Sequence, residues 1–301
     1  MLNRTMNKNE TATLLLSCPD KKGIVAGIAN FINENNGNIL NADQHIDEES
    51  KTLFMRIEWG LKDFAIENEK ITNKFLPVAR EFNITYSLKF SSRTQNIAIF
   101  VSKEDHCLVD LILKKRAGEL KCEIPLIISN HPEVESIVKA LSVNGVNCGN
   151  NNYDYYVVRK NKENKISQEK KELKLLKKYD IDLIVLAKYM QILSKDFVSS
   201  YKNKIINVHH SFLPAFKGAK PYLQAYTNGV KLIGATAHYV TEELDCGPII
   251  EQEVTRISHK DSLEDIINKG KDMEKLVFFH ALKWHLENKI LVYKNKTIVF
   301  D

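Results

Sequence analysis

Ile205-Ile-Asn-Val-His-His-Ser-Phe-Leu-Pro214 is the stretch of this 301-residue chain that decides its fold. Strand-forming apolar residues lead into Asn207 and His209, and Pro214 then ends the run. Asn207 and His209 lie two positions apart, so both side chains project from the same side of a strand. Open α/β sheets bind ligands at the carboxyl ends of their strands, so this stretch predicts a site as well as a strand.

On the amino-terminal side of this stretch, strand-like and helix-like segments alternate. Asn96–Val101, Leu126–Ser129 and Leu183–Ala187 are apolar runs of strand length. Between them, Cys107–Ala117 and a segment that begins at Pro132 have helical patterns. The alternation predicts an α/β fold with a doubly wound, mostly parallel sheet of Rossmann-like type.

The first ninety residues follow a different order. The predicted elements are a strand at Thr11–Cys18, a helix from Ile24, strands at Ile39–Ile46 and Thr52–Glu58, a helix over 68–82 and a strand at Ile84–Phe90. This is the βαββαβ order of a ferredoxin-like domain. The polar linker Ser91–Gln95 follows it, so we expect two domains, residues 1–92 and 93–301.

The composition excludes several classes of protein. A formal charge of +5, from 43 basic and 38 acidic residues, is too small to indicate a nucleic-acid partner. Five scattered cysteines without CxxC spacing are typical of reduced thiols in the cytoplasm. Neither a secretion signal nor a run of membrane-spanning length is present, so we expect no membrane partner. Mixed charges over 159–178 favour a solvated helix face, whose purpose the sequence leaves open.

A second motif supplies a carboxylate for the site. Gly234–Val240 reads as a strand, and Asp245 lies in the turn that follows, just before Gly247-Pro248. From there Asp245 could fold back toward His209, which titrates near neutral pH, and Asn207, which offers an amide. Taken singly, these are also common surface and turn residues, but together they suffice for carbonyl chemistry without a metal.

A zinc site is the alternative reading of the histidines. His209, His210 and His238 are of the right residue type for zinc. Adjacent residues of a strand point to opposite faces, however, so His209 and His210 are poorly placed to share one ion. We therefore predict that the site holds no metal.

Three motifs together give the chain a family resemblance. Ala187-Lys-Tyr-Met-Gln-Ile-Leu193, Asn207-Val-His-His-Ser-Phe-Leu-Pro214 and His238-Tyr-Val-Thr-Glu-Glu-Leu-Asp-Cys-Gly-Pro-Ile-Ile250 resemble the folate-dependent formyltransferase superfamily. The resemblance implies catalytic roles for Asn207, His209 and Asp245. It also implies a pterin pocket formed by Met190, Leu193, Val198, Ile205, Val240, Glu242 and Leu244. The folate is then the substrate, and no cofactor is expected.

Further features are most similar to the formyltetrahydrofolate deformylases within that superfamily. They are Val101-Ser-Lys-Glu-Asp-His-Cys-Leu108, the second histidine at 210, and the ending Lys296-Thr-Ile-Val-Phe300. This likeness implies a hydrolase that converts 10-formyltetrahydrofolate to tetrahydrofolate and formate. Such an enzyme supplies formate to purine synthesis and balances one-carbon folate pools.

The amino-terminal segment Cys18-Pro-Asp-Lys-Lys-Gly-Ile-Val25 resembles an ACT domain. That likeness implies a regulatory unit, homo-oligomers, and methionine and glycine as effectors of opposite sign. Free amides at the start of the first helix suit a carboxylate, so the expected effector site comprises Asp20, Gly23, Ile24 and Asn38. A purely oligomerising role for this unit is the alternative.

Two other functions compete with hydrolysis. A formyltransferase that acts on glycinamide ribonucleotide must bind a phosphate, which calls for a glycine-rich turn after the first strand. Here that turn is Ser102–Cys107, which has no glycine and contains two carboxylates, and this favours water as the acceptor. A non-catalytic sensor is the third possibility, and the intact set of Asn207, His209 and Asp245 argues against it.

Overall fold

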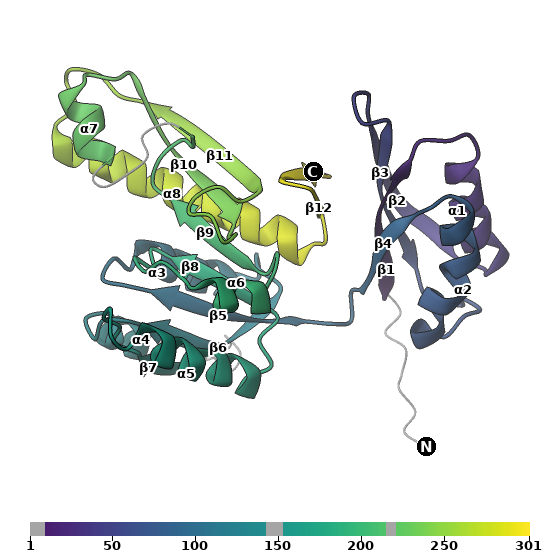
Figure 1. Ribbon diagram of the computed structural model, residues 1–301, viewed down its shortest axis with the longest axis horizontal. Helices are drawn as coiled ribbons and strands as arrows, with labels where there is room; N and C mark the ends of the chain where they lie inside the picture. Colours follow the sequence, from purple (N-terminus) through teal and green to yellow (C-terminus); the bar gives the residue numbers. More distant parts are fainter. Residues whose placement is uncertain (1–9, 143–152, 215–220) are drawn as a thin grey trace. The chain divides into compact units, whose positions relative to one another are not determined.

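The computed structural model describes residues 10–142, 153–214 and 221–301, which form two compact units (Figure 1). The first unit runs to Thr94 and also includes residues 287–293 and 298–301. The second comprises residues 95–286 and 294–297. The predicted boundary is therefore two residues early, and assigning all of 93–301 to the second domain is wrong. The reason is apolar burial: Leu291 and Phe300 pack with Leu15 and Phe54 of the first unit.

The first unit has the predicted βαββαβ order. Its elements are β1 (Thr11–Pro19), α1 (Ile24–Glu34), β2 (Asn38–Asp47), β3 (Thr52–Gly60), α2 (Asn68–Glu81) and β4 (Thr85–Phe90). The strands form an antiparallel sheet in the order β2-β3-β1-β4. Helix α1 buries Ile24, Ile28, Phe31 and Ile32, the face that its i, i+4, i+7, i+8 spacing predicts.

The second unit is built on a seven-stranded sheet. Its elements are β5 (Gln95–Val101), α3 (His106–Arg116), β6 (Cys122–Ser129), α4 (Glu135–Leu141), β7 (Asp154–Val157), α5 (Lys165–Lys178), β8 (Leu183–Ala187), α6 (Lys195–Ser200), β9 (Ile205–His209), α7 (Pro221–Thr227), β10 (Leu232–Tyr239), β11 (Ile249–Arg256) and α8 (Leu263–Leu286). Two short strands, β12 (Ile290–Tyr293) and β13 (Lys296–Val299), follow. The sheet order is β11-β10-β9-β8-β5-β6-β7.

Strand direction within this sheet places the site. The pairs among β9, β8, β5, β6 and β7 are parallel, whereas β10 runs antiparallel to both β9 and β11. The mostly parallel sheet predicted from the sequence is thus confirmed, with two antiparallel strands added at one edge. In the β9–β10 register, Asn207 faces His238 and His209 faces Thr236, at the carboxyl end of β9. Helix α8 lies along β10 and β11 (Figure 1).

The lysine-rich segment contains a helix, α5, that also carries buried acidic residues. Glu169 and Glu172 turn inward, and Lys160 Nζ lies 2.8 Å from Glu172 Oε2 with both side chains almost fully buried. The Tyr189 hydroxyl donates to Glu172 at 3.1 Å, and the Ser194 amide donates to Glu169 at 3.2 Å. These bonds fix the chain between Tyr189 and Ser194, which forms one wall of the site described below.

Two sequence expectations concern membranes and cysteines. Within the described ranges, none of the helices is long and apolar enough to cross a membrane. Cys18, Cys107 and Cys122 are free thiols, and Cys148 lies outside the described residues.

Candidate active site

The structure brings together the three residues that the sequence singled out. Asn207 and His209 are on β9, and Asp245 lies in the turn between β10 and β11. The Nδ1 atom of His209 is 3.4 Å from Oδ2 of Asp245. The prediction that Asp245 reaches His209 is therefore confirmed, while the chemical roles of the three residues stay a proposal.

Close packing of the turn against β10 explains how Asp245 reaches the strand end. Asp245 has a left-handed backbone with φ 54°, which aspartate tolerates better than most residues. Two residues later, a Cβ on Gly247 would lie only 1.7 Å from the carbonyl oxygen of Tyr239. The Tyr239 amide also donates to the Pro248 carbonyl at 2.9 Å. Only glycine permits this approach, so Gly247 is what lets the turn close over the site.

The His209–Asp245 pair has its polar atoms arranged for a ligand. The hydrogen bond from His209 lowers the pKa of Asp245, and although partial burial opposes the effect, the histidine charges add to it. On the other side of the ring, His209 Nε2 is buried and has no hydrogen-bond partner among the described residues. Buried polar atoms are nearly always paired, so this nitrogen is positioned for a group that the ligand supplies.

His238 fixes the amide of Asn207. The Nδ1 atom of His238 lies 3.0 Å from the Tyr239 carbonyl oxygen, which can only accept, so Nδ1 carries the proton. Burial also lowers the pKa of His238 and favours the neutral ring. Its Nε2 atom is then an acceptor for Asn207 Nδ2 at 3.2 Å. This assigns the orientation of the Asn207 amide and leaves its second N–H and its carbonyl oxygen for substrate.

A cavity of about 520 Å³ opens beside these residues. It is lined by Leu186, Lys188, Tyr189, Met190, Gln191, Ile192, Leu193, Val198, Asn207, Val208, His209, His210, His238, Val240, Thr241, Glu242, Glu243, Leu244 and Asp245. Six of the seven residues predicted for the pterin pocket are in this lining: Met190, Leu193, Val198, Val240, Glu242 and Leu244. Ile205 is not, because its side chain is fully buried in the core beneath the pocket.

Sequence reasoning undervalued three residues of this lining. The sequence motifs assign no catalytic role to His238 or His210, and Lys188 stands in one of them without a predicted role. The cross-strand pairing of His238 with Asn207 was the missing signal, and it requires the β9–β10 register. His210 lines the pocket because the strand ends at His209, and the two rings stack with centroids 4.9 Å apart. The alternation rule applies only while the strand continues.

The residues predicted to bind an effector surround the start of α1. Gly23 caps the helix with φ 95°, and Asn38 is the exposed first residue of β2. Asp20 is exposed, and its amide donates to the Lys51 carbonyl at 2.9 Å. The Ile24 side chain is 1% exposed and belongs to the core, so Ile24 can offer a ligand only its backbone.

Comparison with known proteins agrees with this two-unit organisation. The formyl transferase family matches residues 95–282, and the ACT domain family matches residues 12–74. A formyltetrahydrofolate deformylase of Synechocystis is 51% identical over 97% of this chain and 99% of its own length. The crystal structure of a formyltetrahydrofolate deformylase from Pseudomonas syringae matches with a TM-score of 0.91 and 41% identity, covering 99% of this chain and 96% of that one.

A phosphoribosylglycinamide formyltransferase is a more distant neighbour. The crystal structure of that protein from Anaplasma phagocytophilum has a TM-score of 0.60 and 28% identity, and covers 69% of this chain and 96% of its own. The similarity to deformylases, in contrast, extends through both units. This chain therefore belongs to the formyltetrahydrofolate deformylase family, with an ACT domain ahead of a formyl transferase domain.

Proposed function

We propose that this protein hydrolyses the linear amide of 10-formyltetrahydrofolate and releases tetrahydrofolate and formate. The observation that carries the proposal is the His209–Asp245 pair. Both residues line a cavity large enough for a heterocycle, and the buried Nε2 atom of His209 has no hydrogen-bond partner among the described residues. Membership of the deformylase family supplies the substrate. The side chains of the site provide the groups for acyl transfer to water, so the reaction requires no cofactor beyond the folate substrate.

In this mechanism, Asp245 accepts a proton from water as the water oxygen bonds to the formyl carbon. The oxyanion that forms receives hydrogen bonds from His209 Nε2 and from the free N–H of Asn207. When the carbon–N10 bond breaks, the proton held by Asp245 is passed to N10, and formic acid leaves and loses its remaining proton to solvent as formate. Before the water proton is transferred, the Asp245 carboxylate, 3.4 Å from Nδ1, balances the charge of an imidazolium at His209. Once Asp245 is protonated, the oxyanion of the intermediate balances that charge instead.

The folate ring would lie between the 190–193 segment and the 240–244 segment. Met190 is 63% exposed and Leu244 is 60% exposed, and both line the cavity. Large apolar side chains that gather around a concave surface are typical of a ligand site. Glu242 contributes from the same side as Leu244, and the backbone there offers polar groups to the ring edges.

The ACT domain implies control by an amino acid, and we propose methionine and glycine as effectors of opposite sign. The unpaired amides of the first turn of α1 suit a carboxylate, with Gly23 and Asn38 nearby. The exposed edge strand β2, on which Leu40 is 55% exposed, supports a homo-oligomer. The free thiols support a place in the cytoplasm, where the released formate would feed purine synthesis.

The test is an assay with 10-formyltetrahydrofolate as the sole substrate. The proposal predicts equal amounts of tetrahydrofolate and formate without any added acceptor, and opposite changes in rate when methionine or glycine is added. A formyltransferase would release nothing until an amine such as glycinamide ribonucleotide is supplied, and that result would overturn the proposal.

A further inference from the structure

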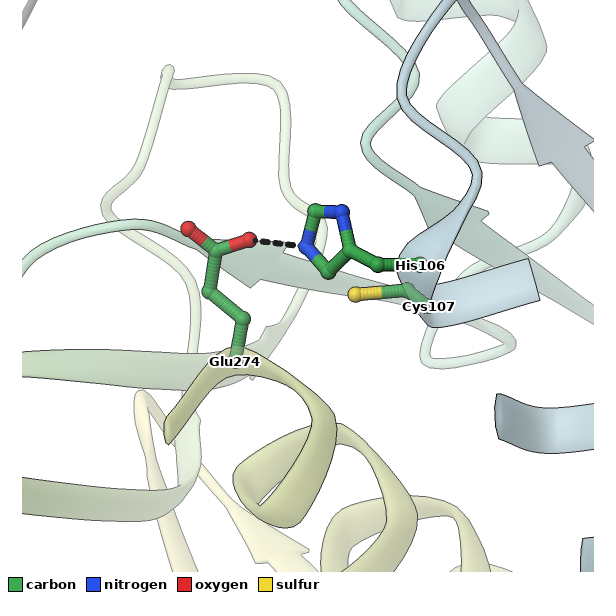
Figure 2. Close-up of side chains that lie close together, drawn as sticks. All are labelled: His106, Cys107 and Glu274. Atoms are coloured by element: carbon green, nitrogen blue, oxygen red, sulfur yellow. Dashed lines mark hydrogen bonds and ion pairs between the residues drawn. The ribbon is translucent and has the colours of Figure 1, made fainter. Parts of the chain in front are cut away.

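A buried carboxylate outside the mechanism above organises a second cluster. Glu274 of α8 is fully buried, and its Oε2 atom lies 2.7 Å from His106 Nε2 at the start of α3 (Figure 2). Its Oε1 atom accepts from Lys188 Nζ at 3.2 Å and from the Tyr222 hydroxyl. A charged carboxylate is tolerated inside a protein when it is paired and hydrogen-bonded in this way. Glu274 therefore holds three side chains from three different segments in fixed positions.

Cys107 also lies beside His106 and Glu274 (Figure 2), which gives the cluster the donor types of a metal site. The Lys188 ammonium, however, already neutralises the carboxylate, and a metal ion would have to replace it. Burial raises the pKa of the Cys107 thiol well above its ordinary value, so it is a poor source of thiolate. The cation that Glu274 binds is thus the lysine of this chain.

Lys188 is the member of the cluster that also lines the catalytic pocket. Leu186 of β8 is in register with Asn207 of β9, and Lys188 directly follows the last residue of β8, so it lies at the end of the sheet where His209 also lines the pocket. Its φ of 59° is a left-handed conformation that favours glycine. A residue other than glycine keeps such a backbone conformation when surrounding contacts hold it in place, and here the ion pair with Glu274 holds Lys188. The lysine is therefore a fixed wall beside the histidines rather than a mobile surface group.

We propose that Lys188, clamped by Glu274, is a specificity-determining residue that occupies the space from which an amine would attack the formyl carbon and leaves room for water. The inference rests on the proposed hydrolysis of 10-formyltetrahydrofolate. A water molecule needs about 30 Å³, whereas an amine nucleophile carries carbon atoms as well. In hydrolysis the water oxygen bonds to the formyl carbon and N10 takes a proton. With an amine, the nitrogen forms that bond and loses a proton, and the products are an N-formyl amine and tetrahydrofolate.

Replacing Lys188 by glycine in the full chain tests this, since glycine suits the backbone and empties the space. The variant and the wild type are incubated with 10-formyltetrahydrofolate, with and without excess glycinamide, and formate and N-formylglycinamide are measured. The wild type is expected to yield formate in both cases. In Lys188→Gly the ratio of N-formylglycinamide to formate should rise about tenfold or more. A ratio equal to that of the wild type would overturn the proposal.

Two control variants sharpen the result. Lys51→Gly makes the same change at another left-handed lysine, with φ 49°, in the exposed turn between β2 and β3. Its product ratio should equal that of the wild type, and an increase there would contradict the proposal. Lys188→Met removes the charge but keeps most of the volume, so it should still give formate. If it forms N-formylglycinamide as readily as Lys188→Gly, the volume argument is wrong.

Two further measurements distinguish a failure of this inference from a failure of the variant to fold and from a failure of the proposed hydrolysis. If Lys188→Gly does not fold because Glu274 has lost its cation, the double variant K188G/E274Q removes the unpaired charge and takes the same test. A wild-type protein that releases no formate would overturn the proposed function itself. If the wild type releases formate but Lys188→Gly, or the double variant K188G/E274Q, keeps the wild-type product ratio, only the role of Lys188 is overturned.

Discussion

Asp245 presents its two carboxylate oxygens to two different histidines. Oδ2 is 3.4 Å from His209 Nδ1, and Oδ1 is 3.7 Å from His238 Nε2. Because His238 Nε2 is the acceptor for Asn207, the atom that faces Oδ1 cannot donate to it. A water molecule is then the natural donor to Oδ1. In the proposed mechanism, one oxygen of the carboxylate therefore contacts His209, and the other accepts a hydrogen bond from the attacking water.

Removing this carboxylate should abolish turnover but not binding. We expect Asp245→Ala and Asp245→Asn to lower kcat for formate release by about a hundred- to ten-thousand-fold, the usual contribution of a positioned acid or base. Affinity for a non-reactive folate should change little, since other residues of the cavity lining are the ones proposed to contact the ring. Steady-state kinetics and a binding titration measure the two effects. Near-normal turnover in both variants would contradict the assigned role.

His210 should make stability depend on pH. Burial, with the charges of Lys188 and His209, lowers the pKa of His210 from 6.5 to about 4. As the pH falls through this window, the unfolded chain binds a proton at His210 and the native chain does not, so the free energy of unfolding decreases. The loss should reach at most about 3 kcal/mol. Denaturant unfolding of the wild type and of His210→Gln measures it, and equal pH dependence in the two proteins would refute the prediction.

At this scale the sequence identified the residues but not all of their contacts. Two-residue spacing was enough to put Asn207 and His209 on one side of β9, and the Asp-x-Gly-Pro turn was enough to suggest a return toward them. The role of His238 depends on strand register, and the clamp on Lys188 depends on Glu274, which is 86 residues away in sequence. No pattern in the neighbouring sequence indicates either of these contacts.

Among the elements, the turn between β10 and β11 does most to position the site. It begins after Tyr239, carries Asp245 in a left-handed conformation and returns through Gly247 and Pro248 to start β11. The Tyr239 amide and the Pro248 carbonyl close it. At Gly247 the turn is in close contact with the backbone of Tyr239, so it has little freedom to adjust there.

Gly247→Ala should therefore disrupt both stability and catalysis. The new Cβ would lie 1.7 Å from the Tyr239 carbonyl oxygen, so the turn must move and carry Asp245 with it. We expect a loss of about 2–4 kcal/mol in the free energy of unfolding and about a hundredfold in kcat. Gly60→Ala is the matched control, because a Cβ there meets nothing closer than 4.0 Å. Chemical denaturation and formate release are measured on both variants. Equal stability and equal turnover in Gly247→Ala and Gly60→Ala would contradict the account.

Segments with a clear apolar pattern were the predictable elements, whereas β7 and β11, the edge strands of the seven-stranded sheet, were not. β8 is a fully apolar run with clear ends, β9 has apolar residues around Asn207 before it ends at His209, and α1 has a regular buried face. β11 is half polar with an irregular burial pattern, and β7 has four residues. An edge strand has fewer neighbours to bury its side chains, so its composition is under weaker constraint and its periodicity is faint.

At the scale of the whole molecule, the end of the chain stabilises its beginning. Leu291 and Phe300 are 9% and 4% exposed and pack with Leu15 and Phe54, with Tyr293 beside them. The linker at 91–95 gave the boundary between the two units to within two residues. The return of residues 287–293 and 298–301 to the first unit could not be read from the sequence, because a short apolar strand fits either core.

Phe300→Ala should destabilise the first unit. The substitution removes a buried ring from this cluster, and we expect a loss of about 3–5 kcal/mol in the free energy of unfolding. Lys74→Ala, at an exposed position of α2, should change it by less than about 0.5 kcal/mol. Hydrogen exchange of the β1 and β3 amides reports on this unit specifically. Equal protection of those amides in the two variants would show that the terminal segment contributes nothing to it.

The most direct test of the central claim is the origin of the oxygen in the product. The full-length protein is given 10-formyltetrahydrofolate in water enriched in oxygen-18, without any amine, and the formate is analysed by mass spectrometry. If water attacks the formyl carbon as proposed, every formate molecule gains one oxygen from the solvent, and tetrahydrofolate appears in equal amount. Formate release that depends on an added amine, or no turnover at all, would contradict the account.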